Sequence, residues 1–467
     1  MSAQGVLTLQ MHHGDAWHDA ARLEILQPER GLQGDTRLDY EIDYFAAFGA
    51  VALSDGTEVR DSRALSVALP VRIMGETTRG WPAFLLDLLP QGHARKRLAG
   101  EIGMDLDNPR LWEALLMRAG GAPIGNTRIK EAHEAEVRRL MGQTFRGLTR
   151  QDMLDLSDHF IDTADRSTLI ASGSSGVQGE WPKVLLTRSR RDGLWYPDPV
   201  VPDSDAAMHI LVKFGRGGDE VRDLILAAEA PYLEIARRFG LRVGGALKAG
   251  NRSLLIPRFD RRVVEQDGRM RVIRLGQESI IAATGVAAFE YTISHEQYLK
   301  TIARHCSDPA GEAVEYVLRD VLNLAMGNPD NHGRNTALAK TDNGYVGLTP
   351  LFDFAPMRLD PQAIPRATRW DCLRRDDLVP DWRKVVDAVV RVTGMNGGLL
   401  VSRLLAAEPF IRDLPAAAER FGVPAEVRRR ALLRCREVAD SLKALRGYES
   451  AAVHVPTDGH GSDEVEP

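Results

Sequence analysis

The densest group of chemically active side chains is the polar segment 327–335, which reads GNPDNHGRN. A further acidic residue, Asp353, stands between apolar residues in the segment LFDFA. A carboxylate in apolar surroundings loses hydration energy unless something binds it, and a metal ion would do so. Phosphoryl transfer needs one carboxylate to orient or deprotonate the attacking hydroxyl, and an amide oxygen and a second carboxylate to hold magnesium against the nucleotide phosphates. Asp330, Asn335 and Asp353 fit these three roles.

The spacing of these residues strengthens the argument. Asp330 and Asn335 have the Asp-x-x-x-x-Asn spacing of the catalytic loop of protein kinases, and Asp353 has the position of their metal-binding aspartate. A lone motif of this kind is weak evidence in a long chain, but its combination with Asp353 is stronger. The alternative is that the loop contains only turn-forming residues and that Asp353 caps a helix.

Elements on both sides of the loop must position these side chains. Apolar residues at helical spacing predict a helix over 314–325, which Gly327 would end in a left-handed conformation. Downstream, the sequence NG at 343–344 predicts a β-hairpin that joins 336–340 to 345–348. The expected order is therefore helix, polar loop and hairpin.

A kinase also has to bind the triphosphate of ATP, and two upstream segments could do so. The run SGSSGVQG (172–179) can present backbone amides to phosphate oxygens, although such a run is often a flexible surface loop. Lys213 lies near the end of the apolar strand HILVKF, and Glu229 adjoins the apolar stripe of the helix that follows. A strand lysine and a helix glutamate at this separation are typical of the ion pair that positions the phosphates in kinases. Lys183 is the alternative for this role, and we favour Lys213.

The composition narrows the class of protein. The chain has 467 residues, of which 44% are hydrophobic and 27% charged, so a disordered or collagen-like chain is excluded. Its net charge of −5 argues against a dedicated nucleic-acid binder. Three cysteines without CxxC spacing suggest neither a disulfide framework nor a structural zinc site. We expect no signal peptide, no membrane segment and a cytoplasmic location.

Local patterns organise the remaining chain. They predict strands at 7–11, 50–53, 64–69, 181–187, 209–214 and 253–256, helices at 81–89 and 110–119, and solvated helices within 130–165. The charged segment RFDRR (258–262) is expected to form an exposed turn of ion pairs. From 278 to 447 the pattern is mostly helical apart from the polar loop and its hairpin.

Taken in order, these motifs resemble the HipA family of bacterial serine/threonine kinases, the toxin halves of toxin–antitoxin modules. The resemblance covers most of the chain. It is carried by ALSVALP (64–70), LDLLPQG (86–92), GGAPIG (120–125), GVQ (176–178) with Lys183, HILVK (209–213), RFDR (258–261), RLGQE (274–278), the loop 327–335 and LFD (351–353).

The resemblance implies a protein serine/threonine kinase that uses ATP and Mg²⁺. Asp330 would be the catalytic base, Asn335 and Asp353 the magnesium ligands, and Lys213 the phosphate-binding lysine. The ATP site would comprise Gly176, Val177, Gln178, Lys183, Lys213, Glu229, His332, Arg334 and Asn335. The expected substrate is a protein Ser or Thr, of the translation-factor or aminoacyl-tRNA synthetase type. A helix-turn-helix antitoxin is a possible partner, through which any contact with DNA would be indirect, in agreement with the acidic net charge.

The resemblance also implies the fold class, which is α+β. We expect a two-lobed protein-kinase-like fold with an extra small N-terminal α+β subdomain and a mostly helical C-terminal lobe. The N-terminal subdomain would span 1–130, the kinase N-lobe-like region with the phosphate loop and Lys213 would span 131–262, and the helical lobe with the catalytic loop would span 263–450. The acidic segment 451–467 is expected to be a disordered tail.

The phosphate loop departs from the family pattern in two ways. The segment GEWP (179–182) lengthens it. The family often carries an autophosphorylated serine just ahead of this loop, where the present chain has Gly173, so Ser172, Ser174 and Ser175 are the candidates for autophosphorylation. A phosphate on one of them would add about two negative charges and favour ejection of the loop from the ATP site.

Two other functions stay open. A small-molecule kinase of the aminoglycoside phosphotransferase type would share the same outline, and failure to label any protein would favour it. A pseudokinase that only binds a helix-turn-helix antitoxin is compatible with the lengthened loop. The presence of Asp330, Asn335 and Asp353 argues against a pseudokinase.

Overall fold

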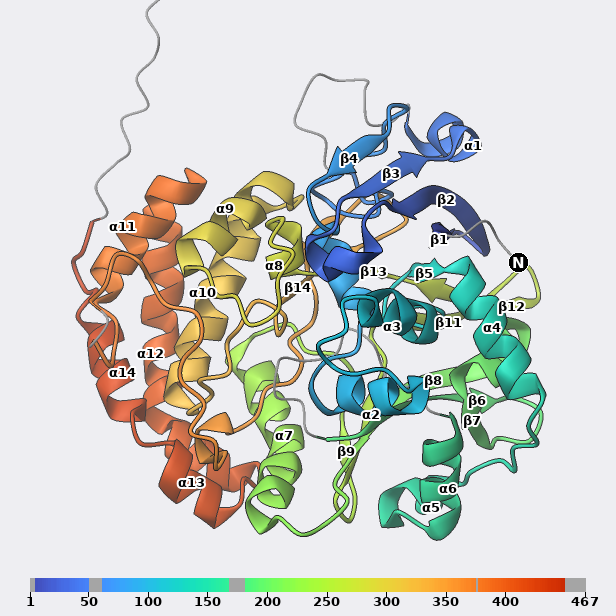
Figure 1. Ribbon diagram of the computed structural model, residues 1–467. Helices are drawn as coiled ribbons and strands as arrows, with labels where there is room; N and C mark the ends of the chain where they lie inside the picture. The colour runs from blue at the N-terminus through green and yellow to red at the C-terminus, as the bar shows by residue number, and fades with distance from the viewer. Residues whose placement is uncertain (1–4, 50–60, 168–180, 375–376, 450–467) are drawn as a thin grey trace, which may run out of the picture.

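The computed structural model describes residues 5–49, 61–167, 181–374 and 377–449. In Figure 1 the strands β1 to β4 lie at the upper right, the strands β6 to β8 lie below them, and the helices α9 to α14 form the left side. The mixed α+β fold is thus as predicted. The predictions made for 50–53, for 172–179 and for the tail 451–467 lie outside the described residues.

An antiparallel sheet with the strand order β4-β3-β2-β1-β5 opens the chain. Its strands are Val6–His13 (β1), Ala16–Ile25 (β2), Thr36–Tyr40 (β3), Glu76–Thr78 (β4) and Thr127–Ile129 (β5). Leu9, Met11 and Leu23 are fully buried in one hydrophobic core. Their core is completed by the 3-10 helix η4 (Ala83–Leu88) and by α2 (Gly92–Ile102), α3 (Leu111–Ala119) and α4 (Lys130–Met141).

The strand predicted over 64–69 is wrong. This segment consists of turns and a single bridge between Ser66 and Leu69. Its apolar residues alternate because they enter two different cores. Leu65 packs with the N-terminal strands, whereas Val67 packs with the helices of the C-terminal half.

A second antiparallel sheet has the strand order β7-β6-β8-β10-β9. Its strands are Lys183–Ser189 (β6), Trp195–Pro197 (β7), Ala206–Phe214 (β8), Lys248–Ala249 (β9) and Ser253–Pro257 (β10). One face of the sheet packs Val184 and Val212 against Met153 of α5 (Arg150–Asp155) and Phe160 of α6 (Asp158–Ser167). The strands predicted at 181–187, 209–214 and 253–256 are confirmed.

The helix α7 (Glu220–Phe239) joins β8 to β9 and packs against both this sheet and the helical half of the chain. It begins at Asp219, whose side chain accepts a hydrogen bond from the backbone N–H of Arg222 at 3.0 Å. It ends at Gly240, which has a φ of +101°. It contacts β10, α12 and α13. Its residue Tyr232 donates a hydrogen bond from its hydroxyl to the backbone oxygen of Met326 at 3.0 Å, directly before the polar loop 327–335.

The rest of the chain is mainly helical. Its helices are α8 (Ile280–Ala283), α9 (His295–His305), α10 (Pro309–Ala325), α11 (Trp382–Thr393), α12 (Gly397–Arg420), α13 (Ala425–Ala431) and α14 (Cys435–Lys443). Two small sheets interrupt them, formed by β11 (Arg261–Gln266) with β12 (Arg269–Arg274), and by β13 (Gly276–Ser279), β14 (Ala337–Lys340) and β15 (Val346–Leu348). Val317, Val321 and Leu322 of α10 are fully buried, which makes α10 the central helix of this half.

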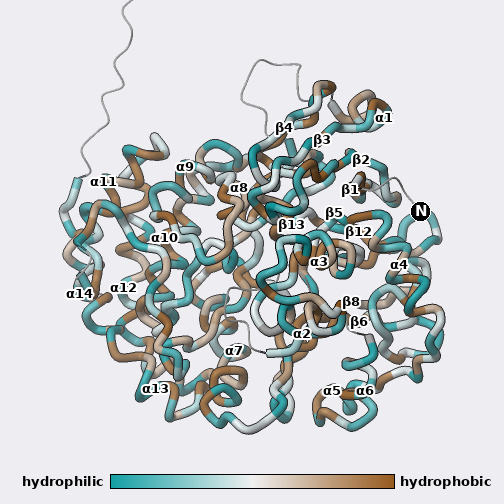
Figure 2. Tube along the Cα trace, viewed as in Figure 1, coloured by the Kyte–Doolittle hydropathy of each residue, from teal (hydrophilic) through white to brown (hydrophobic). Residues whose placement is uncertain are grey.

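Short helical turns complete the chain. They are η1 (Pro28–Gln33), α1 (Ile42–Tyr44), η2 (Phe45–Gly49), η5 (Asp198–Val200), η6 (Asp203–Asp205) and η7 (Met357–Leu359). Brown and teal stretches alternate along the helices in Figure 2. Within the described ranges, no helix combines the length and the apolar character needed to cross a membrane.

Candidate active site

Two lysines on neighbouring strands meet one aspartate. Lys183 of β6 and Lys213 of β8 are paired across the strands. Lys213 Nζ lies 2.8 Å from Asp353 Oδ1, and Lys183 Nζ lies 3.9 Å from Asp353 Oδ2. The two lysines, which the sequence presented as alternatives, therefore occupy the same site.

The lysine and the helix glutamate also form the predicted ion pair. Lys213 Nζ donates to Glu229 Oε2 of α7 at 2.7 Å, and both side chains are at most 5% exposed. Burial by itself lowers the pKa of Lys213, but the carboxylates of Asp353 and Glu229 overcome this and raise it above its ordinary value. For Lys183, burial dominates and lowers the pKa, although Asp353 opposes it. Lys213 is thus a firmly cationic group between two carboxylates.

Asp353 does not cap a helix. The next helical turn, η7, has Pro356 at its N-cap position. Asp353 instead has a φ of +52°, a left-handed backbone conformation that costs energy in a residue other than glycine. This conformation holds its carboxylate against the two lysines.

The polar loop 327–335, the candidate catalytic loop, follows α10 as predicted. Gly327 has a φ of +67°, and a Cβ atom there would lie 2.6 Å from the backbone oxygen of Ala431. The loop is then braced by side chains: Asn331 Nδ2 donates to Thr368 O at 3.0 Å, and Thr368 N–H donates to Asn331 Oδ1 at 3.0 Å. The hairpin of β14 and β15 comes next, so the expected order of helix, polar loop and hairpin is confirmed.

Asp330, His332 and Asn335 form one bonded unit inside the loop. Asn335 Nδ2 donates to the backbone oxygen of Asp330 at 2.9 Å, and Asn335 N–H donates to the backbone oxygen of His332 at 2.9 Å. His332 Nε2 lies 3.4 Å from Asp330 Oδ1. Burial raises the pKa of the Asp330 carboxyl, and the neighbouring His332 ring opposes this.

The residues that could hold a divalent metal share one small cavity. Asp330, Asn335 and Asp353 line a space of about 30 Å³. Asn335 Oδ1 is buried and has no hydrogen-bond partner among the described residues, although the amide nitrogen of the same side chain is bonded. Two carboxylates and a buried amide oxygen are the hard oxygen donors that Mg²⁺ prefers. The described residues contain no cluster of three or more His, Cys, Asp or Glu side chains suited to a metal.

An apolar cavity adjoins the lysines. It has a volume of about 80 Å³, and Lys183, Lys213 and Asp353 are among the polar residues that line it. Its apolar lining consists of Ile124, Leu211, Leu233, Val243, Leu247, Ile256, Pro257, Phe259, Leu351 and Phe352. A flat apolar ring with a charged group at one end, such as a nucleoside phosphate, suits this arrangement.

The segment 258–262 is not the exposed turn that the sequence predicted. Arg258 and Asp260 are 3% and 4% exposed, and Arg258 Nη2 donates to Asp260 Oδ2 at 2.6 Å. Asp260 Oδ2 also accepts a hydrogen bond from Gly125 N–H at 2.9 Å, and Arg261 Nη1 donates to Gly125 O at 2.7 Å. The prediction failed because partners far apart in the sequence bury these charges. They clamp the wall of the apolar cavity to the N-terminal part of the chain.

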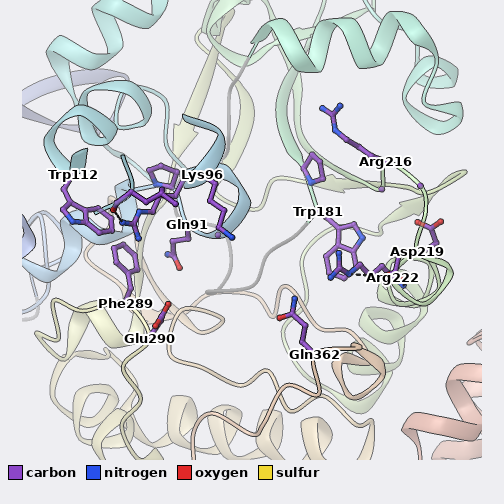
Figure 3. Close-up of a pocket in the computed structure, with 18 residues that line it drawn as sticks. Gln91, Lys96, Trp112, Trp181, Arg216, Asp219, Arg222, Phe289, Glu290 and Gln362 are labelled. Carbon is purple, nitrogen blue, oxygen red and sulfur yellow. Dashed lines mark hydrogen bonds and ion pairs between the residues drawn. The ribbon is translucent and has the colours of Figure 1, made fainter. Parts of the chain in front are cut away.

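A separate and larger cleft, of about 620 Å³, is shown in Figure 3. Gln91, Lys96, Trp112 and Phe289 lie on one side of it, and Trp181, Arg216, Asp219 and Arg222 lie on the other. Trp181 lines the cleft and also contacts Lys213, whose Nζ lies 4.8 Å from the centre of its ring. The two lysines themselves do not line the cleft.

Arg334 is placed apart from the other predicted site residues. Its Nη1 donates to Asp87 Oδ1 at 2.6 Å, and its guanidinium lies 4.9 Å from the centre of the Phe289 ring. Asp87 was missed by the site prediction. Its place in LDLLPQG marked it only as part of a resemblance, since a contact between residues 87 and 334 leaves no local signal.

The structure thus brings Lys183, Lys213, Glu229, Asp330, His332, Asn335 and Asp353 into one region. Gly176, Val177 and Gln178, and the serines Ser172, Ser174 and Ser175, lie outside the described residues.

This constellation and the surrounding α+β fold are kinase-like, and comparisons with known proteins identify the domain. A solved structure of the Shewanella oneidensis MR-1 toxin–antitoxin system, a complex of HipA, HipB and operator DNA, contains a chain that aligns with a TM-score of 0.64 and 19% identity. The alignment covers 95% of this chain and 100% of that chain, which shows a common fold. The Helicobacter pylori proinflammatory kinase CtkA aligns with a TM-score of 0.30 and 12% identity, over 51% of this chain and 87% of that one, a likeness too low to carry an argument.

The sequence itself gives the family of the C-terminal region. Residues 175–395 match the family model of the HipA-like C-terminal domain. No curated protein matches the chain. Residues 175–395 are thus similar to the HipA-like C-terminal domain, and the resemblance to the HipA family is confirmed.

Proposed function

We propose that the protein is an ATP- and Mg²⁺-dependent serine/threonine kinase of the HipA toxin type. The observation that carries the proposal is the meeting of Lys213, Glu229 and Asp353 beside the small cavity that Asp330 and Asn335 share with Asp353. A buried lysine between two carboxylates has little value for stability alone. Such a lysine can instead act as the cation that binds phosphate oxygens.

Each of these residues takes one part of the transfer. The acceptor hydroxyl gives its proton to the Asp330 carboxylate while its oxygen bonds to the γ-phosphorus, and the bond from that phosphorus to the bridging oxygen breaks to release ADP. Lys213 binds the phosphates and is itself held by Glu229. Asn335 and Asp353 would hold Mg²⁺, which supplies positive charge to the phosphate oxygens when bound.

The two larger spaces suit the two substrates. The apolar cavity beside Lys183 and Lys213 suits the base of ATP. The cleft of about 620 Å³ shares Trp181 with the lysine site, and we assign it to the segment of a protein that carries the acceptor Ser or Thr. A translation factor or an aminoacyl-tRNA synthetase is the substrate class that the family resemblance supports.

A helix-turn-helix antitoxin is the proposed partner. The solved complex of similar fold contains HipA with HipB and operator DNA. The net charge of −5 supports contact with DNA through such a partner rather than directly. Autophosphorylation on Ser172, Ser174 or Ser175 is part of the same proposal.

Intact-mass spectrometry after incubation with ATP and Mg²⁺ tests the function. We expect the wild type to gain phosphate, Asp330→Asn to react about 10²- to 10⁴-fold more slowly, and Glu265→Gln, which removes an exposed carboxylate of β11, to behave as wild type. Peptide mapping would then locate the phosphate. ATP binding without phosphate on any protein would reject the proposal in favour of a small-molecule kinase or a pseudokinase.

A further inference from the structure

We propose that Asp87 is a positioning residue for the catalytic loop, and that Arg334 acts through Asp87 rather than on the nucleotide. The proposal rests on the kinase function proposed above. It gives the N-terminal part of the chain a direct role in phosphoryl transfer, because Asp87 belongs to η4 beside the N-terminal sheet.

The Arg334 side chain bonds to a residue of the N-terminal part of the chain. Its Nη1 donates to Asp87 Oδ1 at 2.6 Å, and its Nη2 donates to the backbone oxygen of Ala288 at 3.3 Å. One face of the guanidinium lies against Phe289, a residue that also lines the large cleft. The Arg334 side chain is only 7% exposed. Its guanidinium is already occupied by these two hydrogen bonds and by the contact with the aromatic ring.

Asp87 also bonds to Ser279, a residue next to the loop. Its carboxylate accepts hydrogen bonds from Ser279 N–H and from Ser279 Oγ, both at 2.7 Å. Ser279 is the N-cap residue of α8. The first residues of α8 in turn bond to the loop, since Ile280 N–H donates to Thr336 O at 2.8 Å and Ile281 N–H donates to Gly333 O at 3.2 Å. One carboxylate therefore ties Arg334 to the helix that supports Gly333 and Thr336.

The partly buried position of Asp87, whose side chain is 15% exposed, strengthens these bonds. Burial raises the pKa of the Asp87 carboxyl, and the charge of Arg334 is the largest influence that opposes the rise. Charge-assisted hydrogen bonds in such surroundings fix geometry better than bonds between neutral groups.

The backbone of Arg334 lies inside the catalytic unit. Arg334 N–H donates to His332 Nδ1 at 3.2 Å, and the next residue, Asn335, bonds to the backbone of both His332 and Asp330. A shift of Arg334 would therefore move His332 and Asn335 relative to Asp330. A displacement of about 1 Å in such a unit can cost about 10²-fold in rate.

The test is a double-mutant cycle with Asp87→Asn and Arg334→Gln, measured as kcat, as KM for ATP and as direct binding of ATP. We expect each single variant to lower kcat about 10- to 100-fold, the double variant to lose no more than either single one, and ATP affinity to change less than about 3-fold. Asp87→Glu should restore part of kcat. Asp39→Asn, which removes an exposed carboxylate from an arginine pair of β3, is the matched control and should behave as wild type.

Three results would overturn the inference. The first is an ATP affinity that falls with Arg334→Gln but not with Asp87→Asn, which would place Arg334 on the nucleotide. The second is an additive double variant. The third, for the case in which Asp87→Asn fails to fold, is a Ser279→Ala variant that folds and keeps the full kcat. A wild type that transfers no phosphate would reject the kinase function itself, a result separate from these three.

Discussion

Lys213 shows how one residue can serve both the fold and the chemistry. Its ammonium group is buried and lies within 2.8 Å of a carboxylate on each of two sides. Removing one partner of a buried ion pair leaves an uncompensated charge, which costs far more than the pair itself contributes. Lys183 lies farther from Asp353, at 3.9 Å, and its pKa is lowered by burial. The two lysines should therefore respond differently to substitution.

We predict that Lys213→Met lowers the free energy of unfolding by about 3–5 kcal/mol, because Glu229 and Asp353 then lose their nearest cation. Lys183→Met, the matched control in the neighbouring strand, should cost less. The double variant Lys213→Met/Glu229→Gln should recover part of the loss. Urea denaturation measures all three, and equal losses for the two lysines would contradict this account.

His295 gives the protein a stability that depends on pH. Burial lowers its pKa from 6.5 to about 4, because the ring is enclosed against Tyr316 and Trp370. Between these two pH values the unfolded chain binds more protons than the folded one, so stability falls as the pH falls from 6.5 towards 4. His295→Gln should lose less stability between about pH 7 and pH 5 than the wild type does. Thermal melts at the two pH values check this, and an identical loss in both proteins would refute it.

Residue types and spacing predicted the central cluster because the kinase-like spacing is local. Asp330 and Asn335 share one loop, and the pairing of Lys213 with Glu229 needs only a strand followed by a helix. The part played by Lys183 depends on the register of β6 against β8, which no local pattern contains. Asp87 and Asp260 are buried by partners 247 and 135 residues away, so each resembled an ordinary charged surface residue in the sequence.

At the scale of elements, the unit of α10, loop, β14 and β15 was predicted well. Apolar spacing marked α10, and the sequence NG marked the hairpin between β14 and β15. The turn at Gly327 depends on both its φ of +67° and its contact with Ala431. Ala431 is the last residue of α13 and lies more than a hundred residues after the loop in the sequence. The 64–69 segment was mispredicted since its alternation came from two cores, not from one sheet face.

We predict that Gly327→Ala destabilises the protein more than Gly344→Ala does. Both glycines have positive φ values, but a Cβ at Gly327 would lie 2.6 Å from the backbone oxygen of Ala431, whereas a Cβ at Gly344 would meet nothing within 4 Å. Gly344→Ala should cost about 1–2 kcal/mol, the penalty of the left-handed conformation alone. Gly327→Ala should exceed this and lower kcat, because the loop must shift. Equal melting temperatures for the two variants would show that Ala431 does not constrain the turn.

At the scale of the molecule, buried charges join the N-terminal part to the C-terminal half. Lys340 Nζ of β14 donates to the backbone oxygens of Ala64 and Leu65 at 2.8 and 2.9 Å. Glu278 of β13 accepts hydrogen bonds from Ser66 Oγ at 2.5 Å and from Val67 N–H at 2.9 Å. Lys340 and Glu278 are each 2% exposed and lie 3.6 Å apart. The connection is thus a core contact rather than a surface one.

This connection predicts cooperative unfolding. The wild type should show a single thermal transition in calorimetry. Lys340→Met should remove the cation beside Glu278, cost about 3–5 kcal/mol and separate the unfolding of the N-terminal part from that of the helices. Lys300→Met, which changes an exposed lysine of α9, is the control. A single unshifted transition in Lys340→Met would contradict the prediction.

The clamp between Asp260 and Gly125 has a consequence for how such chains can evolve. Asp260 and Arg261 bond to the backbone of Gly125, and Ile124 beside it forms part of the wall of the apolar cavity. A recombination event that joined the N-terminal part of one lineage to the C-terminal half of another would bring together halves of this clamp that had diverged separately. Such hybrid genes would survive only where the 123–125 and 258–261 segments descend from the same parent or have since been matched by compensating mutations.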